Sequence, residues 1–251
     1  MGKALPPVKS ASPKWNAKPT IVADLGLGLA AVALTAMALQ AWLAAEPLWL
    51  GGSVASYLAL AAVIYHFWPG RRAGFGWPNR ITLARVVLVA VLVGALALPD
   101  VVARHGTILA ALALTAIVLD GLDGWLARVV DGVTAFGARF DMEVDALLIL
   151  VLSIAVVIAG QAGTWVLAIG AMRYVFVAAG WLLPWWRREL PHSAWRKTVC
   201  VIQGLALAAV LLPWIRPPLT EWVLALSLAL LAHSFGRDAL WLMQRRRPLS
   251  D

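Results

Sequence analysis

The chain has 251 residues, of which 62% are hydrophobic and 14% are charged, and its mean hydropathy is +0.82. Apolar runs of about 18 residues or more recur along it, each long enough to span a bilayer, which leaves too little polar sequence for a separate soluble domain. The net charge of +8 is unevenly distributed, and the single cysteine, Cys200, excludes an internal disulfide.

The chain begins with a polar, proline-rich segment, residues 1–20, which we predict to be a cytosolic tail. Eight membrane-spanning helices follow, at about residues 21–44, 48–67, 81–99, 107–129, 141–160, 164–185, 198–215 and 219–243. Residues 246–251 form a basic C-terminus. These elements predict an all-α, polytopic membrane protein without a nucleic-acid partner.

The first two spans, within residues 21–67, are rich in alanine and leucine and carry little chemistry. Gly26 and Gly28 would allow another helix to come close, because small residues let transmembrane backbones approach one another. We therefore expect this accessory helix pair to serve packing or oligomerisation, for example in a homodimer.

Basic residues gather in alternate connections between the spans. One set comprises Lys3, Lys9, Lys14, Lys18, Arg71, Arg72, Arg80, Arg128, Arg139, Arg187, Arg188, Arg196, Lys197, Arg245, Arg246 and Arg247, whereas the opposite connections hold only Arg104 and Arg216. The positive-inside rule then places both termini in the cytoplasm, in a bacterial inner or plasma membrane. The basic rim would also attract anionic lipid headgroups, although setting the topology is an alternative role for the same charges.

Two aspartate pairs interrupt apolar sequence in the blocks DGLDGWLAR, from Asp120, and GARFDMEVD, ending at Asp145. Asp120 and Asp123 are three residues apart, and Asp141 and Asp145 are four apart, so each pair shares one helix face. The segment between the blocks can reverse the chain and bring the two faces together. Carboxylates beside hydrocarbon need neutralisation, and hard divalent cations prefer their oxygens, so the pattern predicts a metal site.

Small and basic residues accompany these aspartates. Gly124 and Gly137 leave room for a ligand to approach the backbone, and Arg128 and Arg139 add anion-binding capacity. A metal, arginines and glycines at one point favour a substrate that carries phosphate.

The two blocks match D-x2-D-G-x2-A-R-x8-G-x3-D-x3-D at every fixed position, and this pattern resembles the signature of the CDP-alcohol phosphotransferases, membrane enzymes of phospholipid synthesis. The segment PNRIT, from Pro78 to Thr82, is similar to the motif that begins the first core helix of that family. The resemblance covers about residues 75–245. It implies a catalytic domain with a six-helix core, to which this chain adds the N-terminal pair.

The resemblance also implies roles for individual residues. Asp120, Asp123 and Asp141 would hold divalent ions, Mg²⁺ or Mn²⁺ and two in number, and Asp145 would be the general base, a further metal ligand, or both. The CDP moiety would be bound by Asn79, Thr82, Gly124, Arg128, Thr134 and Gly137. For Asn79 and Thr82 a simple helix-capping role is the alternative.

An arginine inside the sixth span, Arg173, is a candidate ligand for the acceptor's phosphate or a structural partner for a motif aspartate. Arg139, Arg196 and Lys197 are candidates for the same acceptor pocket, with Arg187 and Arg188 nearby in the sequence. Glu143 is two residues from Asp141, off the metal face, and is expected to form an ion pair.

These observations predict transfer of a phosphatidyl group from CDP-diacylglycerol to a polar, phosphorylated alcohol, with release of CMP. One alternative reverses the lipid role, with CDP-choline or CDP-ethanolamine as donor to diacylglycerol. Another is a cation transporter that uses the aspartates as an intramembrane site, although the acids cluster at one end of the spans rather than along a path.

Overall fold

The computed structural model describes residues 21–68, 75–129, 134–187 and 193–245, without the side chains of residues 123–129, 184 and 187. These ranges are helical and contain no strand. The helices are α1 (Ile21–Leu43), α2 (Leu48–Phe67), α3 (Trp77–Leu96), α4 (Pro99–Arg104), α5 (Gly106–Val129), α6 (Ala135–Ile158), α7 (Leu167–Leu182), α8 (Ala194–Val210) and α9 (Leu219–Gln244), with the short 3-10 helices η1 (Thr164–Val166) and η2 (Pro184–Arg187). Each predicted span coincides with a long helix, and the short α4 is an addition.

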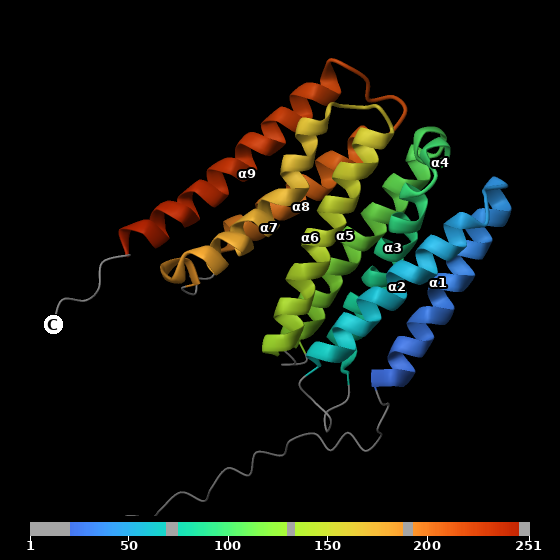
Figure 1. The fold of residues 1–251 in the computed structure, drawn as a ribbon, viewed down its shortest axis with the longest axis horizontal. Helices are drawn as coiled ribbons and strands as arrows, with labels where there is room; N and C mark the ends of the chain where they lie inside the picture. Colours follow the sequence, from blue (N-terminus) through green and yellow to red (C-terminus); the bar gives the residue numbers. More distant parts are fainter. Residues whose placement is uncertain (1–20, 69–74, 130–133, 188–192, 246–251) are drawn as a thin grey trace, which may run out of the picture.

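Helix α3 is the centre of the molecule. It packs against α1 and α2 on one side and against α5 and α6 on the other. In its most apolar window 67% of the residues are buried, compared with 22% in α1 and 28% in α2. Figure 1 shows α7, α8 and α9 on the far side of α5 and α6 from the N-terminal pair. The six long helices from α3 to α9 therefore form the core, and α1 and α2 cover one flank of it.

The first turn of α3 is set by three consecutive residues. Gly76 precedes the helix with a φ of 76°, which a residue with a side chain rarely adopts. Trp77 and Pro78 follow as the first helical residues, where proline is favoured because its missing N–H would have no partner there. This start places Asn79 in the first turn, two residues before residue 81, where the span that we predicted from hydropathy begins.

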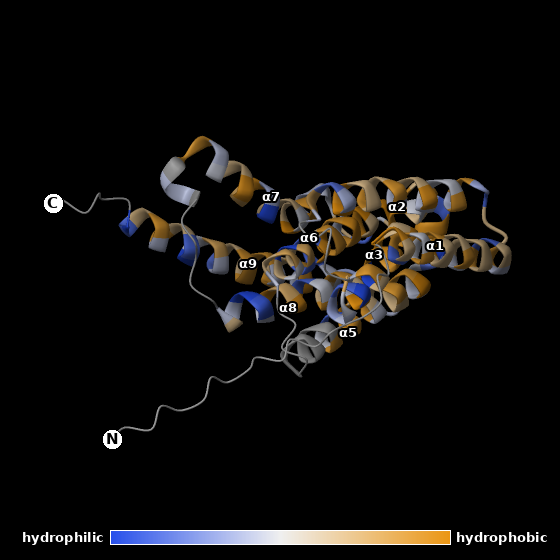
Figure 2. Ribbon diagram, turned by 90° about the horizontal axis from the view of Figure 1, so that it is seen from below, coloured by the Kyte–Doolittle hydropathy of each residue, from blue (hydrophilic) through white to orange (hydrophobic). Residues whose placement is uncertain are grey.

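Five of the described segments are long and apolar enough to cross a membrane, namely α1, α2, α3, α9 and the segment Thr164–Leu182. Helices α5 and α6 carry the aspartates, and α8 has only 17 residues, which lowers the apolar length of all three. Figure 2 shows apolar residues along most helices, with hydrophilic residues at helix ends and among α3, α5 and α6. The protein is an all-α polytopic membrane protein with a polar site embedded in it.

Candidate active site

Three of the four motif aspartates converge between α5 and α6. Asp120 lies on α5, and Asp141 and Asp145 lie one turn apart on α6. One carboxylate oxygen from each falls within 4.8 Å of the others, and Asp120 is only 5% exposed. The predicted meeting of the two aspartate-bearing helices is therefore confirmed for these three residues. The side chain of Asp123 lies outside the described part of the chain.

A fully buried arginine, Arg85 of α3, occupies the centre of this cluster. Its guanidinium donates hydrogen bonds to Asp141 Oδ1 and Asp145 Oδ1, and its Nη1 atom lies 3.3 Å from Asp120 Oδ1. From α8, Lys197 Nζ lies 3.6 Å from Asp120 Oδ2. Helices α3, α5, α6 and α8 thus each contribute a charged side chain to one point.

The start of α6 meets the start of α3 beside the aspartates. Thr134 caps α6, and its hydroxyl oxygen accepts a hydrogen bond from the Gly137 backbone N–H at 3.0 Å. A Cβ atom on Gly137 would lie 2.9 Å from Asn79 Oδ1 and 3.0 Å from Thr134 Oγ1, so a larger residue would not fit without displacement. Three residues predicted to bind the CDP moiety, Asn79, Thr134 and Gly137, are therefore neighbours.

The other residues predicted to bind the CDP moiety are Thr82, Gly124 and Arg128. Thr82 is buried, and its hydroxyl donates to the Pro78 carbonyl at 3.2 Å, as Asn79 Nδ2 donates to the Phe75 carbonyl at 2.6 Å. Both side chains donate to the carbonyl four residues earlier, whereas the N-cap of α3 is Gly76, which has no side-chain cap hydrogen bond, so neither residue caps the helix. Their contact with a nucleotide stays a prediction. Gly124 and Arg128 lie in α5, but their side-chain surroundings are outside the described part of the chain.

The four predicted acceptor residues do not form one cluster. Lys197 lies beside Asp120, whereas Arg139 is exposed near the start of α6. Arg173 donates to Glu143, so Glu143 forms an ion pair as expected, and Arg196 Nη1 lies 3.2 Å from Asp238 Oδ1. Arg173 and Arg196 therefore have acidic partners of their own. Arg188 lies outside the described residues, as does the side chain of Arg187.

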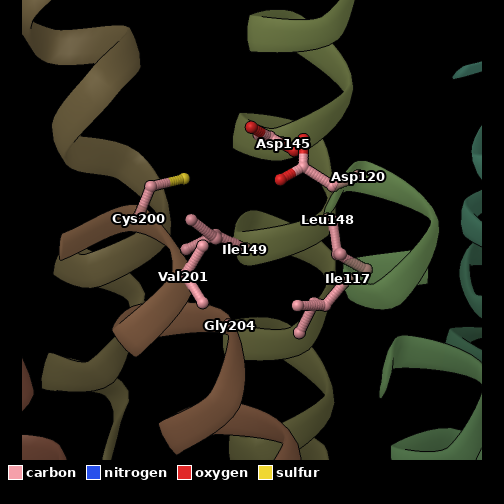
Figure 3. Close-up of a pocket in the computed structure, with 8 residues that line it drawn as sticks. All are labelled: Ile117, Asp120, Asp145, Leu148, Ile149, Cys200, Val201 and Gly204. Atoms are coloured by element: carbon pink, nitrogen blue, oxygen red, sulfur yellow. The ribbon is translucent and has the colours of Figure 1, made fainter. Parts of the chain in front are cut away.

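A small pocket opens below the aspartates between α5, α6 and α8. Figure 3 shows the carboxylates of Asp120 and Asp145 at one end of it, with the thiol of Cys200 across from them. The rest of the lining is apolar or small and consists of Ile117, Leu148, Ile149, Val201 and Gly204. The pocket therefore joins a charged end to an apolar body.

Comparison with known proteins gives one match. The family model for CDP-alcohol phosphatidyltransferase matches residues 75–233, well over half of the chain. The chain belongs to the CDP-alcohol phosphatidyltransferase family. No curated protein and no solved structure matched the chain significantly. Family membership confirms the resemblance seen in the motif and identifies a membrane transferase of phospholipid biosynthesis that uses a CDP-alcohol.

Enzymes of the CDP-alcohol phosphatidyltransferase family depend on divalent metals, and the residues present here fit such an ion. All three clustered donors are carboxylates, which hard cations prefer. Three negative charges face only Arg85 and Lys197, so the described cluster keeps a net negative charge. Asp120 Oδ1 is buried and, although Arg85 Nη1 lies 3.3 Å away, accepts no hydrogen bond from the residues that the structure describes, so its lone pairs can serve a cation.

Arg85 is the site residue of this CDP-alcohol phosphatidyltransferase that the sequence analysis missed. The sequence does indicate Arg85, because it interrupts an apolar run inside the third span. An ionisable residue in such a position is a functional candidate by default. The acidic partners of Arg85, namely Asp120, Asp141 and Asp145, lie on other helices, 35, 56 and 60 residues later in the chain. Spacing within a single helix could not reveal them.

Proposed function

We propose that the protein transfers a phosphatidyl group from CDP-diacylglycerol to a polar, phosphorylated alcohol and releases CMP. The observation that carries the proposal is the convergence of Asp120, Asp141 and Asp145, of which Asp120 and Asp145 border an apolar pocket, within a chain of this family. A lipid-linked CDP has its diphosphate at the boundary between hydrocarbon and water. A carboxylate cluster beside an apolar pocket suits that geometry.

In the proposed reaction, the acceptor hydroxyl oxygen attacks the phosphorus that carries the diacylglycerol. A new P–O bond forms, the bond between that phosphorus and the CMP oxygen breaks, and CMP leaves with the electron pair. Asp145 takes the proton from the attacking hydroxyl. Its position one turn beyond Asp141 supports this role, because it lies at the cluster and also borders the pocket.

Asp120, Asp123 and Asp141, with Asp145 as an additional candidate, would hold Mg²⁺ or Mn²⁺, with two ions in the proposed site. A divalent cation supplies charge neutralisation for the diphosphate and a better leaving group in CMP. The chain's own contribution is to hold the carboxylates in place. Arg85 does this through its contacts with Asp120, Asp141 and Asp145.

Asn79, Thr82, Gly124, Arg128, Thr134 and Gly137 are the proposed contacts for the CDP moiety. Support comes from the close approach of Asn79, Thr134 and Gly137 at the start of α6. Because Gly137 has no side chain, Asn79 and Thr134 can come this close to the backbone of α6. We propose that the nucleotide approaches the backbone there, with the diphosphate directed towards the aspartates.

The acceptor is proposed to be anionic because Lys197 lies beside the cluster and Arg139 is exposed near the start of α6. Lys197 is the best-supported acceptor residue, since its ammonium lies 3.6 Å from Asp120 Oδ2 and its side chain is 52% exposed. Arg139 is exposed and has room to reach a solute. Arg173 and Arg196 would bind an acceptor only by exchanging Glu143 and Asp238 for its phosphate. We also propose that the site and both termini face the cytoplasm, where soluble phosphorylated alcohols are found.

The test is a CMP-release assay with the purified full-length protein in lipid–detergent micelles with Mn²⁺ or Mg²⁺. With CDP-diacylglycerol as donor, turnover is expected with glycerol 3-phosphate or an inositol phosphate, and the matched unphosphorylated alcohols provide the comparison. Asp145→Asn serves as the inactive control. Turnover with free serine or choline alone would overturn the acceptor proposal, and turnover only with CDP-choline and diacylglycerol would overturn the donor.

A further inference from the structure

The N-terminal pair packs on the side of α3 that faces away from the aspartates. Helix α3 lies between α1 and α2 on one side and α5 and α6 on the other (Figure 1). The residues by which α3 enters the site are Asn79, Thr82 and Arg85, which lie on its first three turns. Any shift or rotation of α3 against α1 and α2 therefore moves these three side chains relative to the aspartates.

Contacts between α2 and the C-terminal half of α3 fix the position of α3 along its axis relative to α2. The indole N–H of Trp49, a fully buried residue, donates to the Val91 carbonyl at 3.0 Å. Gly52 lies so close to Gly94 that a Cβ added to Gly52 would be 3.2 Å from the Gly94 Cα, and a Cβ on Gly94 would overlap Ser53. Backbones this close, at small residues, prevent one helix from sliding past the other without a loss of packing.

At the site end, an ion pair joins α1 to α3. Asp24 is 5% exposed, and its Oδ1 atom lies 2.8 Å from Arg80 Nε, in the residue that follows Asn79. Arg80 is further held over the Trp77 ring at 5.1 Å. The Asp24 turn is itself tied to α2, because the Tyr57 hydroxyl donates to the Leu25 carbonyl at 2.8 Å. Gly28, one of the two glycines expected to permit close contact, makes room for the Tyr57 side chain, whereas Gly26 has no neighbouring atom within 4 Å of its added Cβ.

We propose that the α1–α2 pair is a positioning element for the substrate-binding turns of α3, and that Asp24 acts through Arg80 to set the orientation of Asn79. Helices α1 and α2 lie outside the residues matched by the family model, so this positioning element is an addition to the core that the family shares. The inference rests on the proposed function only in so far as Asn79 contacts the nucleotide.

Packing alone does not account for the Asp24–Arg80 pair. The Asp24 carboxylate is buried, whereas the Arg80 side chain is 31% exposed. Such an ion pair is often no more stabilising than apolar residues of the same size, because the carboxylate must leave water. Packing of α1 could be achieved with apolar residues, as it is further along α1, where Val32 and Ala36 are fully buried. The ion pair restricts the rotation of α3 about its axis relative to α1, because the carboxylate binds the guanidinium in a restricted geometry.

The experiment compares Asp24→Asn with Asp100→Asn in the full-length protein. Asp100 also forms an ion pair, with Arg104, but this pair is exposed on α4, at the other end of α3 from Asn79. CMP affinity is measured by calorimetry with Mn²⁺ present, at a temperature well below the melting temperature of each variant. Asp24→Asn is expected to weaken CMP binding and kcat/KM for the CDP-lipid by about tenfold or more, as small displacements of binding groups do, whereas Asp100→Asn leaves both unchanged.

A charge exchange provides the second arm. Asp24→Arg combined with Arg80→Asp restores the pair in reverse and is expected to recover most of the CMP affinity that either single change removes. Wild-type CMP affinity in Asp24→Asn would overturn the proposal, and so would a loss that the exchange does not repair. CMP binding follows from family membership, so it remains a valid readout even where the donor and acceptor of the proposed function prove wrong. Failure of the proposed function is seen instead as a wild-type enzyme that binds CMP but does not use CDP-diacylglycerol.

Discussion

The two halves of α3 are both buried but for different reasons. The half that begins the helix buries Asn79, Thr82 and Arg85, which are polar, while the half after Arg85 buries an apolar run from Val86 to Ala95. In the apolar half, each side chain contributes packing that its neighbours partly duplicate. In the polar half, each group needs a particular partner, because an unpaired charge or amide is costly away from water. The contrast predicts that single substitutions in the polar half change the chemistry, and those in the apolar half change mainly stability.

The largest effect on turnover is expected for Asp141→Asn. This change keeps the size of the side chain but removes one of three clustered negative charges, and loss of a metal ligand should lower CMP release by more than about 100-fold. Glu143→Gln is the matched control, two residues further along α6, where the carboxylate pairs with Arg173 rather than with the cluster. Turnover of Asp141→Asn above about a tenth of the wild-type rate would contradict its assignment as a ligand.

Arg85→Gln should follow, with a loss in both activity and stability. Removing the guanidinium leaves Asp120, Asp141 and Asp145 to repel one another, and breaking such a buried pair costs about 3–5 kcal/mol of unfolding free energy. Thermal unfolding in detergent measures this, with Arg104→Gln at the exposed Asp100 pair as the control. Addition of Mn²⁺ should raise the melting temperature of Arg85→Gln more than that of the wild type, because a cation replaces part of the lost positive charge. Equal shifts in the two proteins would contradict this account of the cluster.

Gly137→Ala should have an intermediate effect that is confined to the nucleotide. Its methyl group would come 2.9 Å from Asn79 Oδ1 and 3.0 Å from Thr134 Oγ1, and such overpacking typically costs about 1–3 kcal/mol. We expect a higher KM for the CDP-lipid and a smaller change in that for the acceptor, measured by varying each substrate in turn. Gly236→Ala provides the comparison, since its added Cβ meets no atom within 4 Å. If Gly137→Ala left the CDP-lipid KM at the wild-type value, the nucleotide would have to bind elsewhere.

The smallest effect on turnover is expected in the apolar half, for Leu92→Ala. Leu92 is 1% exposed, and truncation of such a residue lowers the unfolding free energy by about 2–5 kcal/mol. Activity per folded molecule, measured well below the melting temperature, should stay within about twofold of the wild type, since the cavity is remote from the charged groups. A fall in kcat as large as that of Arg85→Gln would erase the distinction between the two halves.

The same contrast explains what the sequence could predict. Apolar runs predicted every long helix, because a span must be apolar for about 20 residues regardless of its neighbours. Local spacing predicted that Asp141 and Asp145 share a face and that they would meet Asp120. It did not identify Arg85 or Asp24, whose partners lie 35 residues or more away in the chain. Nor could it assign Arg173 to Glu143, because which faces of α6 and α7 meet depends on the packing of the whole bundle.

The central arginine also has a consequence for the order in which the protein is assembled. Arg85 is synthesised before Asp141 and Asp145, which follow 56 and 60 residues later. An arginine in the middle of a lone membrane helix is disfavoured by about 2.5–3.5 kcal/mol. As the nascent chain leaves the translocation machinery, it is therefore favourable for α3 to stay at the interface between membrane and water until α5 and α6 have been synthesised. Insertion of α3 is in this way coupled to the synthesis of α6. A chain truncated before Asp141 should be recognised as incomplete by membrane quality control.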